Sequence, residues 1–494
     1  MSQTIQPDAP LPGIEHIVVL MQENRSFDNV LGNLYPASAS FDGIPAGASN
    51  SYRALLHHTV KPTSEPPSGK SIYITPNPDP AESQGHMHFQ IYNGGTTPTM
   101  GGFAQSYYDA HRIEGNPGDI MCYFDSTAND GAGQLPMTAF LARTFAVSDR
   151  WFGAGPVQTF PNRMFAFCAT AGNFDNQAPI DNIDYWPLGH GYGDVLGSMT
   201  ATSVFELLDT ASNSATYDPS NWKVYFHDVP LSAINSYVYG ALTAGSGCVS
   251  SFDGSDYTPP HGATFLDDVR AGTLPAFAFI EPRYWSNYSQ GGHPANSNHP
   301  GNDDYHTLGK TGHPIDCRNG ETLLTDVYDA LTSRPALFDK TLLIVIYDEH
   351  GGVWDHVAPL AAPTPYGPDS GVANAEVYST TGPRVPAFFV NPAIAAGTVL
   401  RPPSGSAYAF DHTSIIATLT AQFGLAGPLT CRDAATPVLS GLIVPGTTPR
   451  PVAELAVPRG LLPPRPPGGT PGTRRTLADH EQLVRSWAAR DAEA

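Results

Sequence analysis

The sequence predicts an α/β protein with a mainly parallel sheet and helices on both faces, and two observations support this fold class. Several short apolar runs are continuous rather than alternating, as expected of strands that are covered on both faces. These runs are residues 17–21, 275–280, 341–347 and 384–390. Segments with helical spacing of apolar residues lie between them, and such alternation is typical of a parallel sheet between helical layers.

Polar clusters follow two of these predicted strands. The run IVVLM leads directly into QENRSF, and the run TLLIVIY leads directly into DEHGG. In parallel α/β sheets, ligands bind outside the carboxyl ends of the strands. We therefore expect the two clusters to meet in one site.

Two amphipathic helices are predicted together with their ends. One covers residues 320–335 and ends at Pro335, and its apolar residues recur at helical spacing: Leu323, Leu324, Val327, Tyr328 and Leu331. The other covers residues 411–424, with Asp411 as its N-cap and Gly424 as its C-terminal stop.

Long loops and a change in composition indicate how the chain is divided. The loops are rich in Gly, Pro, Asn and Ser, and loops of such length usually form sites or lids; they cover residues 33–120, 171–200 and 284–320. The sequence becomes rich in Pro and Gly near residue 446. We therefore predict three parts: a catalytic domain over residues 1–445, a linker or surface tail over 446–475, and a short C-terminal helix over 476–494.

The composition favours a loop-rich globular enzyme. Of the 494 residues, 41% are hydrophobic and 14% are charged, and Gly and Pro number 48 each. The net charge of −21 argues against broad nucleic-acid binding, which needs a basic face. The sequence indicates no obligate protein partner.

Targeting signals and cysteines leave the compartment open. No run of 18 apolar residues occurs, and the start MSQTIQPDAPLPG lacks the pattern of a signal peptide. A cytoplasmic location, export by another route to the periplasm or medium, and removal of a leader all remain alternatives. The five cysteines form no CxxC pair, which disfavours a cysteine-rich zinc site, and their odd number leaves at least one unpaired within the chain.

The acidic residues at the two strand ends predict a cation site. Glu23 and Asn24 follow the first strand, and Asp348, Glu349 and His350 follow the other. A lone carboxylate after a strand is more often a cap, but adjacent acids repel each other unless a cation neutralises them. Oxygen ligands favour magnesium, calcium or manganese, while imidazoles nearby keep zinc and iron open.

A hydroxyl and several histidines are further candidates. Thr159 precedes FPNR, and Pro161 in a first helical turn would place Thr159 near a helix N-terminus, where it could be a simple cap or a nucleophile. A hydroxyl nucleophile needs a partner that gives a proton to the leaving group, and histidine suits that role near pH 7. His86 and His313 are the main candidates for it, and His299 and His227 are weaker ones.

These motifs together make the chain resemble the bacterial phospholipase C and acid phosphatase family, which includes the plant non-specific phospholipases C. The resemblance covers most of residues 14–425, and the motifs ENRSFD and YDEHGG are its most specific parts. Further matching segments, in order, are GHMHF, TFPNR, FAFIEPRY, HPIDCRNGE, GPRVPAFFVNP and FDHTSIIATLTAQFGL.

The resemblance implies an alkaline-phosphatase-like core with one divalent metal ion. Carried over residue by residue, the metal ligands are Glu23, Asn24, Thr159, Asp348 and Glu349. It also implies Thr159 as the nucleophile.

The same resemblance implies roles for histidines and arginines. His86, His313 and His350 would be catalytic, although the segment around His313 reads HPIDC and is one residue shorter than the family's. Arg25 and Arg163 would bind phosphate oxygens, with support of the Glu23–Asn24 loop as the alternative for Arg25.

The hydroxyl bears on the substrate. Family members that resemble phospholipases carry Thr at this position, which favours phospholipase C cleavage of phospholipids through a phospho-threonine. Two alternatives stay open: an acid phosphatase for soluble phosphomonoesters, and a non-catalytic lipid- or glycan-binding protein. Lipid substrates imply peripheral membrane contact, for which exposed aromatic residues could line a groove, unless they pack between loops: Phe103, Tyr107, Tyr108, Trp285 and Tyr288.

Overall fold

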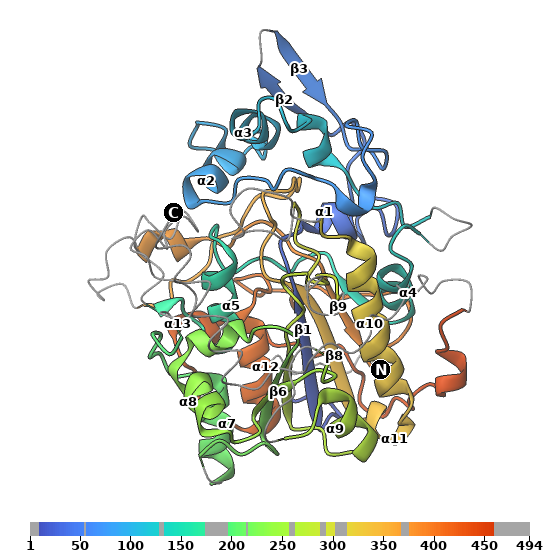
Figure 1. The fold of residues 1–494 in the computed structure, drawn as a ribbon, viewed down its shortest axis with the longest axis vertical. Helices are drawn as coiled ribbons and strands as arrows, with labels where there is room; N and C mark the ends of the chain where they lie inside the picture. The colour runs from blue at the N-terminus through green and yellow to red at the C-terminus, as the bar shows by residue number, and fades with distance from the viewer. Residues whose placement is uncertain are drawn as a thin grey trace.

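A computed structural model gives the fold, and it describes residues 9–53, 56–127, 133–172, 196–213, 216–255, 262–286, 293–301, 314–366 and 375–458. Its centre is an eight-stranded sheet with the order β10-β4-β9-β8-β1-β7-β5-β6 (Figure 1). The strands are β1 (His16–Gln22), β4 (Ala146–Ser148), β5 (Trp222–Phe226), β6 (Val249–Ser251), β7 (Phe277–Ile280), β8 (Thr341–Tyr347), β9 (Ala387–Val390) and β10 (Thr398–Val399).

The predicted mainly parallel sheet is confirmed. Strand β1 runs parallel to both β7 and β8, and the same direction continues through β5 and β6. Strand β9 is antiparallel to β8 and to β4, so it is the reversed strand within this sheet. The strand predicted within residues 384–390 is therefore present as β9, but the sequence did not predict that it runs antiparallel to its neighbours.

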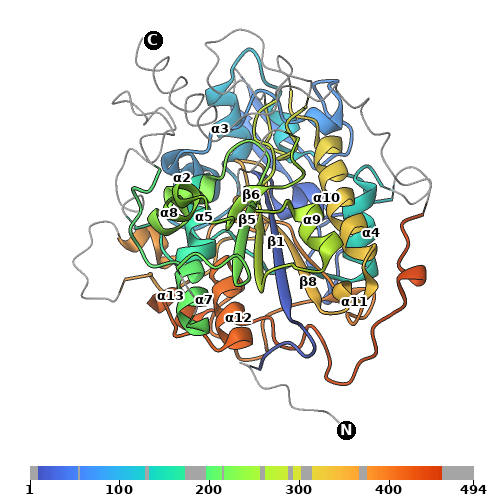
Figure 2. The same ribbon diagram turned by 60° about the horizontal axis from the view of Figure 1, so that its bottom comes forward.

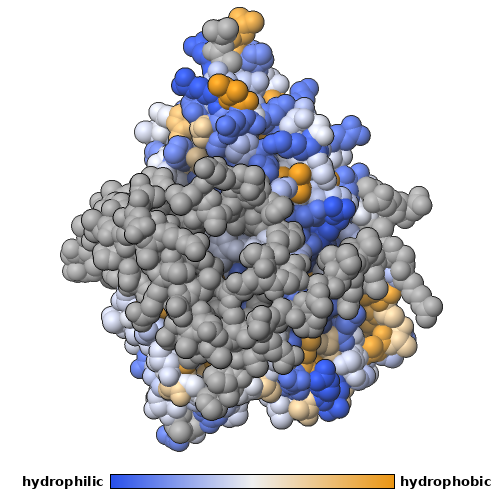
Figure 3. Space-filling model, viewed as in Figure 1, coloured by the Kyte–Doolittle hydropathy of each residue, from blue (hydrophilic) through white to orange (hydrophobic). Residues whose placement is uncertain are grey.

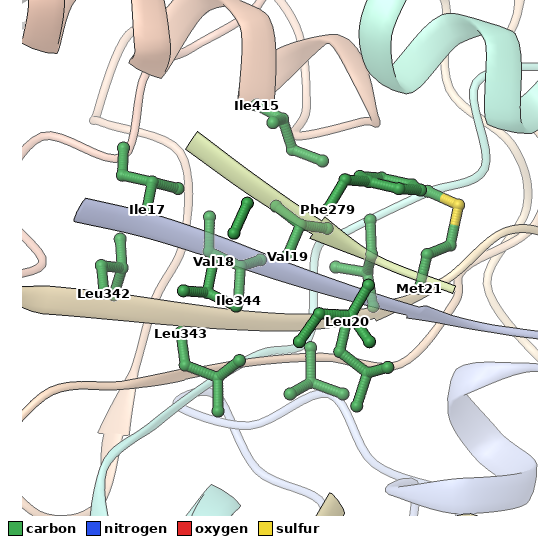
Figure 4. Packing of buried hydrophobic residues seen from close by; sticks show 14 of the residues in the cluster. Ile17, Val18, Val19, Leu20, Met21, Phe279, Leu342, Leu343, Ile344 and Ile415 are labelled. Atoms are coloured by element: carbon green, nitrogen blue, oxygen red, sulfur yellow. The ribbon is translucent and has the colours of Figure 1, made fainter. Parts of the chain in front are cut away.

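Strand β1 is buried on both faces over most of its length. Residues 17–21 have no exposed surface, and Val19 pairs with both Phe279 and Ile344. Figure 4 shows these side chains packed above and below the strands, with Ile415 of a covering helix among them. Burial on both faces explains why the sequence of β1 is continuously apolar.

Helices cover both faces of the sheet, as predicted (Figures 1 and 2). One layer contains α4 (Pro136–Thr144), α9 (Phe265–Ala271), α10 (Cys317–Thr332) and α11 (Pro335–Phe338). The other contains α5 (Thr159–Cys168), α7 (Val204–Ser212), α8 (Ser236–Ala244), α12 (Thr413–Phe423) and α13 (Cys431–Ala435). Within the described part of the chain, no helix is both long and apolar enough to cross a membrane.

The two predicted helices are present with shifted starts. Helix α10 begins at Cys317, three residues before the predicted segment. Helix α12 begins at Thr413 with His412 at its N-cap, while the predicted cap Asp411 accepts a hydrogen bond from the Thr413 N–H at 2.8 Å. Gly424 ends α12 in the left-handed conformation, as predicted.

Residues 33–121 form a smaller unit above the carboxyl ends of the parallel strands (Figure 1). Its elements, with α1 before it, are α1 (Phe27–Val30), β2 (Asn50–Arg53), β3 (His57–Val60), α2 (Gln84–Tyr92), α3 (Phe103–Ala110) and the 3-10 turns Ile72–Ile74 and Pro117–Met121. The remaining 3-10 turns are Leu231–Ile234, Ala375–Ser379 and Val452–Glu454.

This unit has a small apolar core of its own. Phe103 and Tyr107 are buried in it, so of the two alternatives given for these aromatic residues, packing holds for this pair and exposure in a lipid groove does not. Tyr108 and Trp285 are half-buried, and Tyr288 lies outside the described residues.

The C-terminal segment lies along the surface as far as it is described. Arg450 donates to the carbonyls of Thr144 and Ile394, and the Tyr328 hydroxyl donates to the Leu455 carbonyl at 2.6 Å. The predicted helix over residues 476–494 lies outside the described residues, and the division near residue 445 stays a prediction. The five cysteines are all unpaired, and Cys431 alone among them is exposed.

A buried carboxylate caps a helix from a distance. Helix α4 starts at Pro136, its N-cap Leu135 offers no side-chain cap, and Glu321 of α10 accepts hydrogen bonds from the N–H groups of Met137 and Thr138. Replacing Glu321 with Ala would leave these amides buried and unpaired, so we expect a loss of about 2 kcal/mol or more in the free energy of unfolding, measured by urea denaturation.

The Glu321→Gln variant is the matched control, because it keeps one acceptor oxygen. Burial raises the pKa of Glu321 from 4.5 to about 7, so the folded chain binds this proton more tightly than the unfolded chain does. Binding of this proton stabilises the folded state most below pH 4.5, and the stabilisation is lost as the pH rises through about 7. The free energy of unfolding of Glu321→Gln should not show this loss. An Ala variant as stable as the wild type would contradict the capping role.

Candidate functional site

The two predicted polar clusters meet at the carboxyl ends of β1 and β8. The Asp348 N–H donates to the Gln22 carbonyl at 3.1 Å, and the Asn24 N–H donates to Asp348 Oδ1 at 3.0 Å. Asn24 adopts a left-handed conformation with φ of 52°. A Cβ atom at Gly351 would stand 2.0 Å from the Asn24 carbonyl oxygen, so only glycine fits where the two chain segments cross.

Thr159 joins this cluster from the first residue of α5. Its hydroxyl donates to Asn24 Oδ1 at 3.0 Å, and the side chain is 6% exposed. The Asn162 amide holds the preceding loop by donating to the carbonyls of Val157 and Gln158. The FPNR sequence therefore fixes the turn that presents the Thr159 hydroxyl.

Arg163, from the same motif, ties α5 to the second cluster. Its Nε donates to Asp348 Oδ2 at 3.0 Å, and its Nη2 lies 4.0 Å from Glu23 Oε1. The guanidinium lies over the Tyr284 ring at 5.2 Å and is 1% exposed. Its Nη1 is buried without a hydrogen-bond partner in the described structure.

Glu82, which the sequence analysis did not single out, and His299, one of its weaker candidates, hold the Asn24 amide. Its Nδ2 donates to Glu82 Oε1 at 2.8 Å and lies 3.0 Å from His299 Nε2. Because an amide NH2 only donates, His299 Nε2 is the acceptor, and the ring carries its proton on Nδ1, which donates to the Pro300 carbonyl at 2.6 Å. These contacts turn Asn24 Oδ1 toward Thr159.

Four buried carboxylates lie in this cluster, and their burial shifts the pKa values of several of them. They belong to Glu23, Glu82, Asp348 and Glu349, and none is more than 7% exposed. Burial, with the neighbouring Asp348 adding to it and Arg163 opposing it, raises the pKa of Glu23 to about 8. Burial, together with neighbouring carboxylates, also raises the pKa of Glu82 and of Glu349 well above 4.5.

Two buried histidines support the DEHGG segment. His350 Nδ1 lies 3.2 Å from Glu349 Oε2, and its Nε2 lies 3.0 Å from Gln90 Oε1. Burial lowers the pKa of His350 to about 3, so its ring is neutral. His412 accepts from the Trp151 indole N–H and donates from Nε2 to the Asp348 carbonyl at 2.5 Å.

The other predicted histidines are not among these contacts. His86 is exposed on α2, its Nδ1 lies 2.7 Å from the Ser83 hydroxyl, and no hydrogen bond in the described structure joins its ring to the cluster. His313 lies outside the described residues. The roles of both in proton transfer stay predictions.

Arg25 occupies the supporting position that the sequence left as an alternative. The side chain has no exposed surface, its Nε donates to the Asn298 carbonyl at 2.7 Å, and its Nη1 donates to the Thr75 carbonyl at 2.9 Å. These bonds join the loops around Asn24, while Arg25 Nη2 is buried without a hydrogen-bond partner in the described structure, so a phosphate contact by Arg25 stays a prediction.

The residues present fit a divalent cation. Glu349 Oε1 is buried without a hydrogen-bond partner, and the Asn24 and Thr159 oxygens lie 3.0 Å apart, so they could face one ion. A cation would relieve the repulsion among the carboxylates. Hard oxygen donors of this kind suit magnesium, calcium or manganese.

Two groups of acidic and histidine residues in the described structure have metal-ligand spacing, and neither contains Glu23, Asp348 or Glu349. Asp79, Glu82 and His299 adjoin the cluster, so acidic and histidine groups that could bind a metal are present there. The second group is Asp28, Asp355 and His356, whose polar atoms already bond to one another and to Arg384. We therefore read the second group as a buried ion-pair network.

Comparison with known proteins gives consistent matches. The Phosphoesterase family model matches residues 14–426. Non-specific phospholipase C6 of Arabidopsis thaliana is 29% identical over 465 residues, covering 90% of this chain and 75% of that protein. Phospholipase C B of Mycobacterium tuberculosis is 28% identical over 455 residues, covering 85% and 76%.

A solved structure also matches, at a low score. It is a protein in the alkaline phosphatase superfamily from Vibrio parahaemolyticus, with a TM-score of 0.30 and 11% identity. The match covers 61% of this chain and 64% of that chain.

Glu82 gives a prediction about this site. Glu82→Ala removes the acceptor that orients Asn24, so we expect Mn²⁺ to bind about 10- to 100-fold more weakly, as measured by titration calorimetry on cation-free protein. Glu82→Gln keeps an acceptor oxygen and should lose far less. Equal losses in the two variants would contradict a role in positioning Asn24.

Proposed function

The chain belongs to the Phosphoesterase family, a family of phosphoric ester hydrolases, and from that premise we propose that it cleaves phospholipids as a phospholipase C. The observation that carries this proposal is the Thr159 hydroxyl, held 3.0 Å from Asn24 Oδ1 beside the buried carboxylates. Relatives of plant and bacterial origin that cover most of the chain are named phospholipase C, which supports the choice of substrate class.

Thr159 is the proposed nucleophile. Its Oγ passes its proton to a neighbouring carboxylate and attacks phosphorus, a bond forms between Oγ and phosphorus, and the bond from phosphorus to the diacylglycerol oxygen breaks. A divalent cation held by Glu23, Asn24, Thr159, Asp348 and Glu349 would make the hydroxyl easier to deprotonate and would screen charge on the phosphoryl oxygens. The product of this step is diacylglycerol, and the phosphorylated head group stays on Thr159.

The diacylglycerol oxygen needs a proton as it leaves. Among the described histidines, His299 contacts the Asn24 amide, but its Nε2 accepts from that amide and its Nδ1 proton goes to the Pro300 carbonyl, so it suits a positioning role. His86 and His313 are therefore the proposed groups for this proton transfer. In the second step a water attacks phosphorus, the bond to Oγ breaks, Thr159 regains its proton, and the phosphorylated head group leaves.

The remaining residues act by position. Arg163 neutralises part of the charge on Asp348 and fixes α5 against β8, so the nucleophile and the carboxylates keep one geometry. His350 holds Glu349 through its neutral ring, which favours a positioning role over proton transfer. Arg163 would contact a phosphate oxygen through its Nη1, which lacks a hydrogen-bond partner in the described structure.

A substrate panel tests the choice of reaction. We expect turnover of phosphatidylcholine with release of diacylglycerol and a phosphorylated head group, at a kcat/KM well above that for 4-nitrophenyl phosphate. Mass spectrometry of the products identifies the bond that breaks. Faster turnover of the monoester would favour the acid phosphatase alternative, and absence of turnover on both substrates, with divalent cations supplied, would favour a binding protein.

Replacement of Thr159 tests the nucleophile. We expect Thr159→Ala to lose about 10³-fold or more in kcat, because the attacking oxygen is absent, while its thermal unfolding midpoint stays close to that of the wild type. Thr159→Ser keeps a hydroxyl and is the matched control, with most activity retained. An Ala variant with near-normal kcat would rule out the phospho-threonine.

A further inference from the structure

The β2–β3 hairpin stands apart from the central sheet as a separate two-stranded sheet. Figure 1 shows it at the upper end of the molecule, beyond α2 and α3 and on the side where the carboxyl ends of the parallel strands lie. The strands have four residues each and pair antiparallel, with Tyr52 opposite His58 and Arg53 opposite His57. A hairpin this short is marginally stable alone, so its projection needs an explanation.

The base of the hairpin is firmly held by α3. Asn50 is buried, its amide donates to the Met100 carbonyl at 2.8 Å, and its Oδ1 accepts from the Ala104 N–H at 3.0 Å. The Arg53 N–H donates to Gln105, and the Tyr52 ring lies 5.3 Å from the Tyr108 ring. The end of the hairpin is therefore presented on a fixed support.

That support also reaches the candidate site. Helices α2 and α3 are joined where the Gly102 N–H donates to the Gln90 carbonyl at 3.0 Å. The Gln90 side chain in turn contacts His350, next to Glu349. The hairpin and the site thus share one small structural unit.

The end of the hairpin combines an apolar side chain with basic ones. Leu56 is 72% exposed, and Arg53, His57 and His58 are exposed near it, while Lys61 is exposed at the base of the hairpin, next to Val60, which pairs with Asn50. The His58 ring stacks on Tyr52, with 5.0 Å between ring centroids. Figure 3 shows hydrophobic atoms at this end of the molecule beside strongly hydrophilic ones.

The local charge is opposite to that of the whole chain. Residues 43–64 contain Arg53 and Lys61 and no Asp or Glu, although the chain carries 46 acidic residues and a net charge of −21. The acidic residue of the supporting helix α3 is Asp109, whose Oδ2 accepts from the Gln105 amide at 2.9 Å. An exposed leucine that is flanked by basic and aromatic side chains is typical of segments that enter the interface of anionic membranes.

We propose that the β2–β3 hairpin docks the protein on an anionic lipid surface, with Leu56 entering the interface and Arg53 and Lys61 facing the head groups. This inference rests on the proposed phospholipid substrate and names the surface that brings the site to it. The charge complementarity favours a lipid surface over a protein partner, which needs no anionic head groups.

Vesicle binding by the full chain tests the proposal. Sedimentation with vesicles of phosphatidylcholine and phosphatidylserine should show about tenfold weaker partitioning for Leu56→Ser. The double variant Arg53→Gln/Lys61→Gln should weaken binding to these vesicles, as added salt should, and should leave binding to pure phosphatidylcholine vesicles unchanged. The matched control Val444→Ser, at an apolar residue 54% exposed elsewhere in the chain, should bind as the wild type does.

A soluble substrate separates this proposal from the proposed function. On a short-chain phosphatidylcholine below its micelle concentration, the hairpin variants should keep wild-type turnover, because none of the changed residues touches the site. The docking role would be overturned if the wild-type protein did not bind anionic vesicles, or if Leu56→Ser bound them as the wild type does. Either result would count even if turnover is normal. Absence of turnover on the soluble substrate would count against the proposed function alone.

Discussion

The structure depends on one electrostatic constraint, the burial of several carboxylates at the ends of two parallel strands. Charges of one sign in a low-dielectric interior repel strongly, so they persist only where opposite charge and hydrogen bonds offset that cost. Arg163 supplies a fixed positive charge against Asp348, and backbone N–H groups of Asn24 and Glu349 supply donors to the same side chain. The Glu349 oxygen without a partner marks where compensation by the described protein groups is incomplete.

The side chains around the Thr159 hydroxyl come from distant parts of the chain. Helix α5 brings the hydroxyl, the 33–121 unit brings Glu82 and Gln90, and a loop after β7 brings His299. A separate buried network of Asp28, Asp355, His356 and Arg384 locks the segment after DEHGG to α1. The site is therefore rigid because each contributing loop is tied to another, and the continuous apolar strand β1 anchors the whole arrangement.

The sequence predicted the strands and their polar ends well, because continuous apolar runs and abrupt polar clusters are local signals. It predicted residues 33–120 as a loop, which is wrong because they contain helices and a hairpin, and it could not predict which of them face the site, since long-range packing decides that. The GHMHF motif drew attention to His86, but Ser83 caps α2 by accepting the His86 N–H, and His86 then lies on the exposed side of the first turn. Glu82, just before that cap, faces Asn24 instead. The reversed direction of β9 likewise had no signal in its sequence.

The cation content of the protein tests the central claim most directly. Inductively coupled plasma mass spectrometry of protein purified without chelators should find one divalent cation per chain. Variants such as Glu349→Gln, checked for folding by circular dichroism, should lose it. A protein that holds no divalent cation and still hydrolyses phosphate esters at full rate after exhaustive chelation would contradict the account.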